Sequence, residues 1–206
     1  MLCETPCQNI SVSTSTIYPM ADSTNGMNTA SLGEAIRDEL AISMPELKVC
    51  FDHEPKKKRT GKWYATVAYI KSEEGKHPKR ARSLSHIDIS ILNEDKALVL
   101  CEIEESHASP KLMIGDIGNL LLADYVGFKK KEYLIDGAHI VLAFKAEKDG
   151  RMAEKAELIE KRIKERFGLK GMTLCIICRP NIKALKDDTR NHIVEYLKSE
   201  VNVTTP

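Results

Sequence analysis

Two apolar segments joined by a short polar turn constrain the fold of this chain more than any other feature. Residues 86–92 read His-Ile-Asp-Ile-Ser-Ile-Leu, and this period of two predicts one strand with its three isoleucines on one face and Asp88 on the other. Residues 93–96 read as a turn, so residues 97–105 should return as an antiparallel partner strand. The beginning of that second strand is apolar on both faces, which is typical of a central strand.

Helical and strand patterns alternate through the rest of the chain. Ser31 and Glu34 have the spacing of a capping box, and Ser109-Pro110 reads as the N-cap and first residue of a later helix. The alternation in the C-terminal half implies parallel crossovers joined to an antiparallel N-terminal half, so we predict an α/β domain with a mixed central β-sheet and helices on both faces. Helices are predicted from Ser31 as far as Pro45 and over 110–125, 152–167 and about 187–199, with further strands over 48–53, 63–70, 139–144 and 173–178.

The length of 206 residues suits one domain. Residues 1–28 are rich in Ser, Thr and Asn and predict a disordered tail before a single domain over residues 29–206. This tail has neither the basic start nor the apolar middle of a secretory signal, and Met20 and Met27 leave open a later start. No apolar run reaches the roughly 20 residues that cross a bilayer, so we expect no membrane segment. The formal net charge of +1 restricts any nucleic-acid-binding surface to a local patch.

The cysteines predict no disulfide and no metal site. Cys175 and Cys178 have a C-x-x-C spacing, but they lie inside an apolar segment that reads as one strand. Residues three apart on a strand face opposite sides, so the two thiols should not meet. Buried, reduced cysteines predict a cytoplasmic protein.

Three acids converge at the end of the predicted hairpin if its register brings Asp88 opposite Glu102. Glu102 and Glu104 are two residues apart on one strand, so they share a face with about 6–7 Å between their Cα atoms. Asp88 belongs to the neighbouring strand. Carboxylates packed this closely repel one another, whereas Mg²⁺ takes one or two of them together with water and phosphate oxygens. The alternative is a solvated strand end, because charge runs are usually surface.

This arrangement resembles the PD-(D/E)XK nuclease superfamily, which includes type II restriction enzymes and Holliday-junction resolvases. The resemblance covers roughly residues 29–180 and depends on the order of the elements, Asp88 on one strand and Glu102-Ile-Glu104 on the next. It implies a restriction endonuclease-like fold in which Asp88 and Glu102 bind Mg²⁺ or Mn²⁺. Glu104 stands where the family usually has lysine, although a minority of restriction enzymes also carry glutamate there.

The resemblance also implies roles for residues around the metal. Glu104 would act as the catalytic residue that orients or deprotonates the attacking water. The family often adds an acid from the first helix, for which Glu39 is the preferred candidate and Glu34 the rival. Lys111, in the first turn of the helix after the acids, could replace the missing lysine. His86 shares the predicted face of Asp88 and could contact phosphate or a metal-bound water.

Two basic loops, residues 56–62 and 76–82, could contact a phosphate backbone and make binding salt-dependent. Such loops are also common solubility features, so the alternative is an ordinary basic surface. The predicted nucleic-acid-binding residues are Lys56, Lys57, Lys58, Arg59, Lys79, Arg80, Arg82 and Lys111.

The sequence thus leads to one hypothesis and one rival. The hypothesis is a Mg²⁺-dependent endonuclease that hydrolyses phosphodiester bonds in DNA in preference to RNA. The resemblance leaves a homodimer open, since many nucleases of this type dimerise to cut two strands, but the sequence carries no interface signature. The rival is an inactive nuclease-fold protein that binds nucleic acid or serves as a scaffold.

Overall fold

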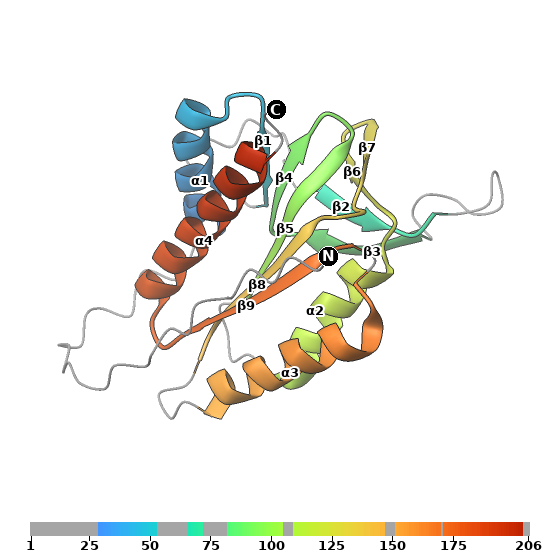
Figure 1. Cartoon of the computed structure of the whole chain (residues 1–206). Coiled ribbons are helices and arrows are strands. Elements are labelled where there is room, and N and C mark those ends of the chain that lie inside the picture. The colour runs from blue at the N-terminus through green and yellow to red at the C-terminus, as the bar shows by residue number, and fades with distance from the viewer. Residues whose placement is uncertain are drawn as a thin grey trace.

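The computed structural model describes residues 29–52, 66–71, 82–104, 109–146, 151–169 and 171–203 (Figure 1). The predictions for residues 1–28 and for most of both basic loops lie outside these ranges. The helices are α1 (Thr29–Ser43), α2 (Pro110–Leu122), α3 (Arg151–Phe167) and α4 (Ile182–Val203). The strands are β1 (Lys48–Phe51), β2 (Thr66–Tyr69), β3 (Ser83–Ile87), β4 (Ile89–Asn93), β5 (Lys96–Glu104), β6 (Tyr125–Phe128), β7 (Lys131–Leu134), β8 (His139–Lys145) and β9 (Thr173–Arg179).

The sheet is mixed, as predicted. Its main part has the order β1-β4-β5-β8-β9, in which β4 is antiparallel to both β1 and β5, while β5, β8 and β9 run parallel. A second part, β7-β6-β2-β3, is antiparallel throughout and joins β5 where Lys96 pairs with Leu134. The parallel strands are connected through helices, as parallel neighbours require.

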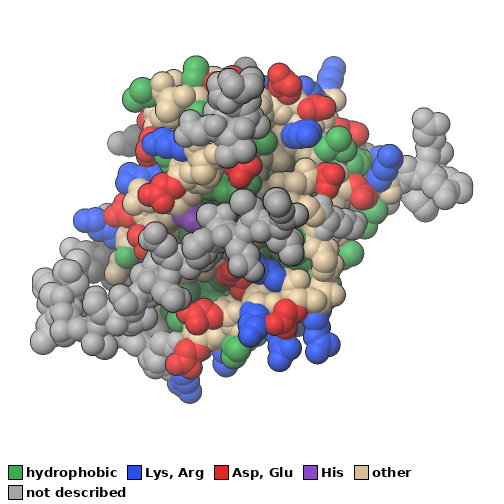
Figure 2. Space-filling view, viewed as in Figure 1, with side chains coloured by type: hydrophobic (Ala, Val, Ile, Leu, Met, Phe, Trp, Pro, Cys, Tyr) green, Lys and Arg blue, Asp and Glu red, His purple; other side chains and the backbone are tan. Residues whose placement is uncertain are grey.

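Helices cover both faces of the main sheet, which confirms that prediction (Figure 1). Leu142 of β8 belongs to the apolar cluster under α2 and α3, whereas its neighbour Val141 belongs to the cluster under α1 and α4. A strand buried on both faces therefore reads as continuously apolar. Acidic and basic side chains are interspersed over the face shown in Figure 2.

The segment predicted as one strand over residues 86–92 is two strands that meet at Asp88. Ile87 packs in the cluster under α2 and α3, whereas Ile89 and Ile91 pack in the cluster under α1 and α4. The prediction that all three isoleucines share a face was therefore wrong. The chain changes partners at this point, because β3 pairs with β2 while β4 pairs with β1 and β5.

Several helices begin or end at other residues than the sequence predicted. α1 begins at Thr29, so Ser31 lies inside the helix, where its hydroxyl accepts a hydrogen bond from Lys186 of α4, and the capping-box prediction was wrong. α2 ends at Leu122, and the unpredicted hairpin β6-β7 follows, with Lys129 at φ 55° in its turn. The N-cap at Ser109 is confirmed, since its Oγ accepts a hydrogen bond from the backbone N of Leu112 at 3.3 Å. α4 begins at Ile182, five residues earlier than predicted.

The prediction that Cys175 and Cys178 face opposite sides of their strand is confirmed. Cys175 packs against the cluster under α1 and α4, and Cys178 packs against the cluster on the other face. Both are free thiols, as are the buried Cys50 and Cys101. Among the described residues, no helix is long and apolar enough to cross a membrane.

Candidate metal and active site

Asp88 and Glu102 lie opposite each other where β3, β4 and β5 meet. The register pairs Ile89 with Cys101, so the next position on each strand brings Asp88 opposite Glu102, after an irregularity between Ile91 and Leu92 that shifts the register by one residue. The backbone N of Asp88 donates a hydrogen bond to Oε2 of Glu102 at 3.4 Å. Oδ2 of Asp88 accepts a hydrogen bond from the backbone N of Ile103 at 2.8 Å. Each carboxylate is therefore held by the backbone of the other's strand.

Glu102 is nearly buried because it lies on a strand in the middle of the sheet. β5 lies between β4 and β8, and Cys101 directly before the acid has no exposed surface. Glu102 itself is 9% exposed, whereas Glu104, two residues later on the same face, is half-buried. The strand thus carries one carboxylate inside the protein and a second toward its surface.

The charge on this buried carboxylate is opposed by its surroundings. Burial raises the pKa of the Glu102 carboxyl well above its ordinary value, and the charges of Asp88, Asp116 and Asp52 raise it further. The hydrogen bond from the backbone of Asp88 lowers the pKa of Glu102 but does not reverse the shift. Burial and the charge of Glu104 also raise the pKa of Asp116 in α2. Five acids therefore influence one another at this end of β5.

Two of these acids, Asp52 and Asp116, were not predicted. Asp52 follows β1, is 9% exposed, and donates its backbone N–H to the carbonyl oxygen of Asp88 at 2.9 Å. Asp116 lies in α2, three residues after Met113 and four before Leu120, and both of these side chains are on the buried face of the helix. That spacing puts an acid at the edge of an apolar helix face, and this is a signal that the sequence offered.

The structure does not bring Glu39 to this group. Its carboxylate contacts two basic residues of α4, with Oε2 at 3.7 Å from Nε of Arg190 and Oε1 at 3.8 Å from Nζ of Lys198. Glu39 therefore faces the helix beside α1, and the expected contribution to catalysis is not supported by its position. The rival, Glu34, is half-buried one turn closer to the start of α1.

The basic residues fall into different settings. Nη1 of Arg82 donates hydrogen bonds to the hydroxyl of Tyr125 at 2.7 Å and to the carbonyl oxygen of Ile70 at 3.5 Å, so this guanidinium connects β2, β3 and β6. Lys111 is exposed in the first turn of α2, and His86 is exposed on β3. The other predicted nucleic-acid-binding residues, Lys56, Lys57, Lys58, Arg59, Lys79 and Arg80, lie outside the described ranges.

The donor set suits a hard cation held by few protein ligands. Within the described residues, no three His, Cys, Asp or Glu side chains are arranged to bind one metal ion directly. Mg²⁺ commonly takes only one or two carboxylates and fills its remaining positions with water or substrate phosphate. Asp88 and Glu102 supply such a pair, and a cation between them would offset the charges that raise the pKa of Glu102.

Comparison with known proteins adds no family assignment. No family model, no curated protein and no solved structure matches this chain. The structure itself shows an α/β fold with a mixed sheet between two pairs of helices.

Proposed function

We propose that this protein is a metal-dependent nuclease that hydrolyses phosphodiester bonds in DNA. The observation that carries the proposal is the opposition of Asp88 and Glu102 at the buried end of β5, where each carboxylate is fixed by the other strand's backbone. A buried carboxylate surrounded by further acids is costly in a folded protein unless a positive charge compensates it. The resemblance to the PD-(D/E)XK superfamily supplies the reaction class.

Each acid has a separate role in the proposed reaction. Bound Mg²⁺ would polarise the scissile phosphate and lower the pKa of a water molecule. Asp88 and Glu102 would hold the cation, and hydrogen bonds from the backbone keep both carboxylates oriented. Glu104 is half-buried on the same face of β5, so it orients the attacking water and accepts its proton. Asp116 lies close enough to Glu104 for the charge of Glu104 to raise its pKa.

The rival is an inactive nucleic-acid-binding protein on the same scaffold. One observation favours it: residue 104 is a glutamate, whereas the family usually has lysine at this position. This protein would bind nucleic acid through its basic loops without needing a metal.

Substitutions that preserve shape separate the two functions. We expect Asp88→Asn and Glu102→Gln each to reduce Mg²⁺-dependent or Mn²⁺-dependent DNA cleavage by more than about a hundredfold, because metal stabilisation is worth several kcal/mol in such reactions. Glu104→Gln should reduce cleavage by about 10²–10⁴-fold, the usual contribution of a general base. Glu157→Gln, an exposed change on α3, is the matched control and should leave cleavage unchanged.

The substrate panel should contain linear, nicked and branched DNA together with RNA. Binding of Mn²⁺ is measured by titration calorimetry in the same buffers. Absence of cleavage on every substrate, with no heat of Mn²⁺ binding, would overturn the nuclease proposal. Nucleic-acid binding that survives Asp88→Asn unchanged would then support the rival.

A further inference from the structure

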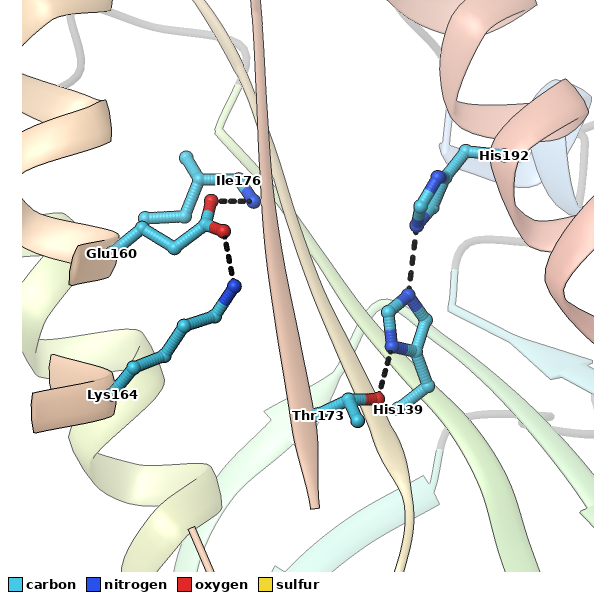
Figure 3. A network of polar contacts seen from close by, with 6 residues as sticks. All are labelled: His139, Glu160, Lys164, Thr173, Ile176 and His192. Carbon is cyan, nitrogen blue, oxygen red and sulfur yellow. Dashed lines mark hydrogen bonds and ion pairs between the residues drawn. The ribbon is translucent and has the colours of Figure 1, made fainter. Parts of the chain in front are cut away.

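A second polar cluster lies on the other face of the sheet, between β8, β9 and α4 (Figure 3). Nε2 of His139 in β8 lies 2.8 Å from Nε2 of His192 in α4. On its other side, Nδ1 of His139 lies 2.6 Å from Oγ1 of Thr173 in β9. His139 is only 5% exposed, and His192 is half-buried. These side-chain contacts connect α4 to β8 and β9.

Packing holds the two rings in this arrangement. The ring of Tyr196, one turn further along α4, stacks on His139 with 4.0 Å between ring centroids and 17° between planes. Ile193 and Val194 of the same helix are buried in the cluster under α1 and α4. The packing of α4 on the sheet therefore holds the two imidazoles close together.

The contact between the two Nε2 atoms has room for one hydrogen only. In the neutral pair, one ring donates its Nε2–H and the other accepts with a bare Nε2. A first added proton can go to Nδ1 of the donating ring and leave this hydrogen bond intact. A second must go to the accepting Nε2, because the Nδ1 of that ring already carries a hydrogen. Two N–H groups then face each other across 2.8 Å, and two positive rings repel.

The charged side chains that act on this group of residues belong to α3 and α4, and they do not cancel the effect of burial on the two histidines. On α4, Glu195 lies close enough to favour protonation of His192, and Glu200 acts on Tyr196. On α3, across the edge of β9, Glu160 favours protonation of His192 and Lys164 disfavours protonation of His139. The partner of His139 on β5 is the apolar Val99.

We propose that His139 and His192 form an acid-sensitive latch that fastens α4 to β8 at neutral pH and releases it when both rings are protonated. The proposal depends on the geometry of the contact and is independent of the nuclease function. The latch lies on the α1 and α4 side of the sheet, whereas Glu102 lies with Asp116 on the α2 side.

The direction of the pH dependence follows from the histidines. Burial lowers the pKa of His139 from 6.5 to about 3, with the charges of His192 and Lys164 adding to the shift. Burial also lowers the pKa of His192, against the opposing charges of Glu195 and Glu160. The folded state then binds fewer protons than the unfolded state below pH 6.5. Stability from the pair is complete above pH 6.5 and is lost as the pH falls from 6.5 toward 3.

The test compares unfolding constants from urea denaturation between pH 7.5 and pH 4.5. For the wild type, each titrating ring should raise the unfolding constant by up to about tenfold per pH unit below 6.5. His139→Gln/His192→Gln retains polar groups that can hydrogen-bond but removes both protonation sites, so its pH slope should be smaller by one to two protons. His86→Gln, which removes an exposed histidine from β3, should keep the wild-type slope.

Two measurements on the intact wild-type protein keep the proposal testable if the double variant does not fold. Hydrogen exchange should show amide protection in α4 falling with acid before protection in β4 and β5 falls. NMR titration should show that neither imidazole protonates near pH 6.5 while α4 remains protected. An ordinary midpoint for both rings in the folded protein, or identical pH slopes in the wild type and the double variant, would overturn the latch.

Discussion

Glu102 is the residue whose charge fits its surroundings least well. It is 9% exposed, it faces Asp88, and the charges of Asp116 and Asp52 also raise its pKa. One backbone N–H at 3.4 Å is a weak compensation for this burial, since hydrogen bonds weaken with distance. The side chain therefore reduces stability at neutral pH in the absence of a cation, as functional sites often do.

Replacing this charge should stabilise the protein. Glu102→Gln keeps an oxygen that can accept the hydrogen bond from Asp88, and it removes the buried negative charge. A carboxyl whose folded pKa is raised contributes stability below its unfolded pKa near 4.5, and that stability is lost as the pH rises through the folded pKa. We therefore expect the variant to be more stable than the wild type by about 1 kcal/mol or more at pH 8, and equally stable below pH 4.5.

Urea denaturation at several pH values measures this difference, with the exposed Glu157→Gln as control. Added Mg²⁺ should narrow the gap, because only the wild type gains from a cation beside Glu102. A variant less stable than the wild type at pH 8 would show that the carboxylate is already compensated within the protein.

At the scale of elements, α1 packs very closely against β1. This contact sets the position of β1, the strand that Asp52 follows. Gly33 lies on the buried side of α1, and a Cβ there would lie 2.4 Å from Cγ of Phe51. Only a residue without a side chain allows this contact. Phe51 in turn carries the guanidinium of Arg37 above its ring, 5.5 Å from the centroid.

Adding one methyl group at this contact should push the helix and the strand apart. We expect Gly33→Ala to destabilise the protein by about 1–3 kcal/mol, the usual cost of overpacking a core. Phe51→Leu in the same chain should recover part of the loss because it makes room for the methyl. Thermal denaturation measures both.

The matched control is Gly115→Ala in α2, where an added Cβ meets nothing within 4 Å. This change should raise stability by roughly 0.5–1 kcal/mol, since alanine is the better helix former. If Gly33→Ala were equally stabilising, the close approach of α1 to β1 would not limit the fold.

At the scale of the whole molecule, β9 is an edge strand of the main sheet among the described strands, and such an edge can pair with other molecules unless it is protected. Glu160 of α3 provides some of it. One carboxylate oxygen accepts the backbone N–H of Ile176 at 2.9 Å, and the other lies 2.6 Å from Nζ of Lys164 (Figure 3). A side chain thus occupies a donor on the strand edge.

Removing this carboxylate should expose the edge. Glu160→Ala leaves the N–H of Ile176 without its acceptor, so we expect a loss of about 1–3 kcal/mol in stability. We also expect concentration-dependent association in analytical ultracentrifugation, because an open edge donor can pair with another chain.

Lys164→Ala is the control for the charge pair. It retains the acceptor for Ile176, so it should cost about 1 kcal/mol or less and leave the protein in its wild-type association state. Equal association in the two variants would contradict edge protection by Glu160.

The sequence by itself determined the elements that have strong local signals and the pairing that carries the candidate site. Period-two and helical patterns predicted the mixed α/β fold, the N-cap at Ser109 and the opposite faces of Cys175 and Cys178. A short turn between two apolar segments predicted the antiparallel pairing of these strands, but the register depends on an irregularity between Ile91 and Leu92. The pairing of Asn93 with Lys96 beside the turn would, if continued, bring Asp88 opposite Cys101, and the shift by one residue brings it opposite Glu102.

Only the tertiary structure decided which distant residues join that pair. Asp52 and Asp116 reach the acids from β1 and α2, while Glu39 pairs with α4. The periodicity of apolar residues indicates which face of an element is buried, but not which element covers it. It therefore could not predict that the strand partners change at Asp88, or that histidines of β8 and α4 are in contact. Those features depend on packing between segments that are far apart in the chain, which no local pattern encodes.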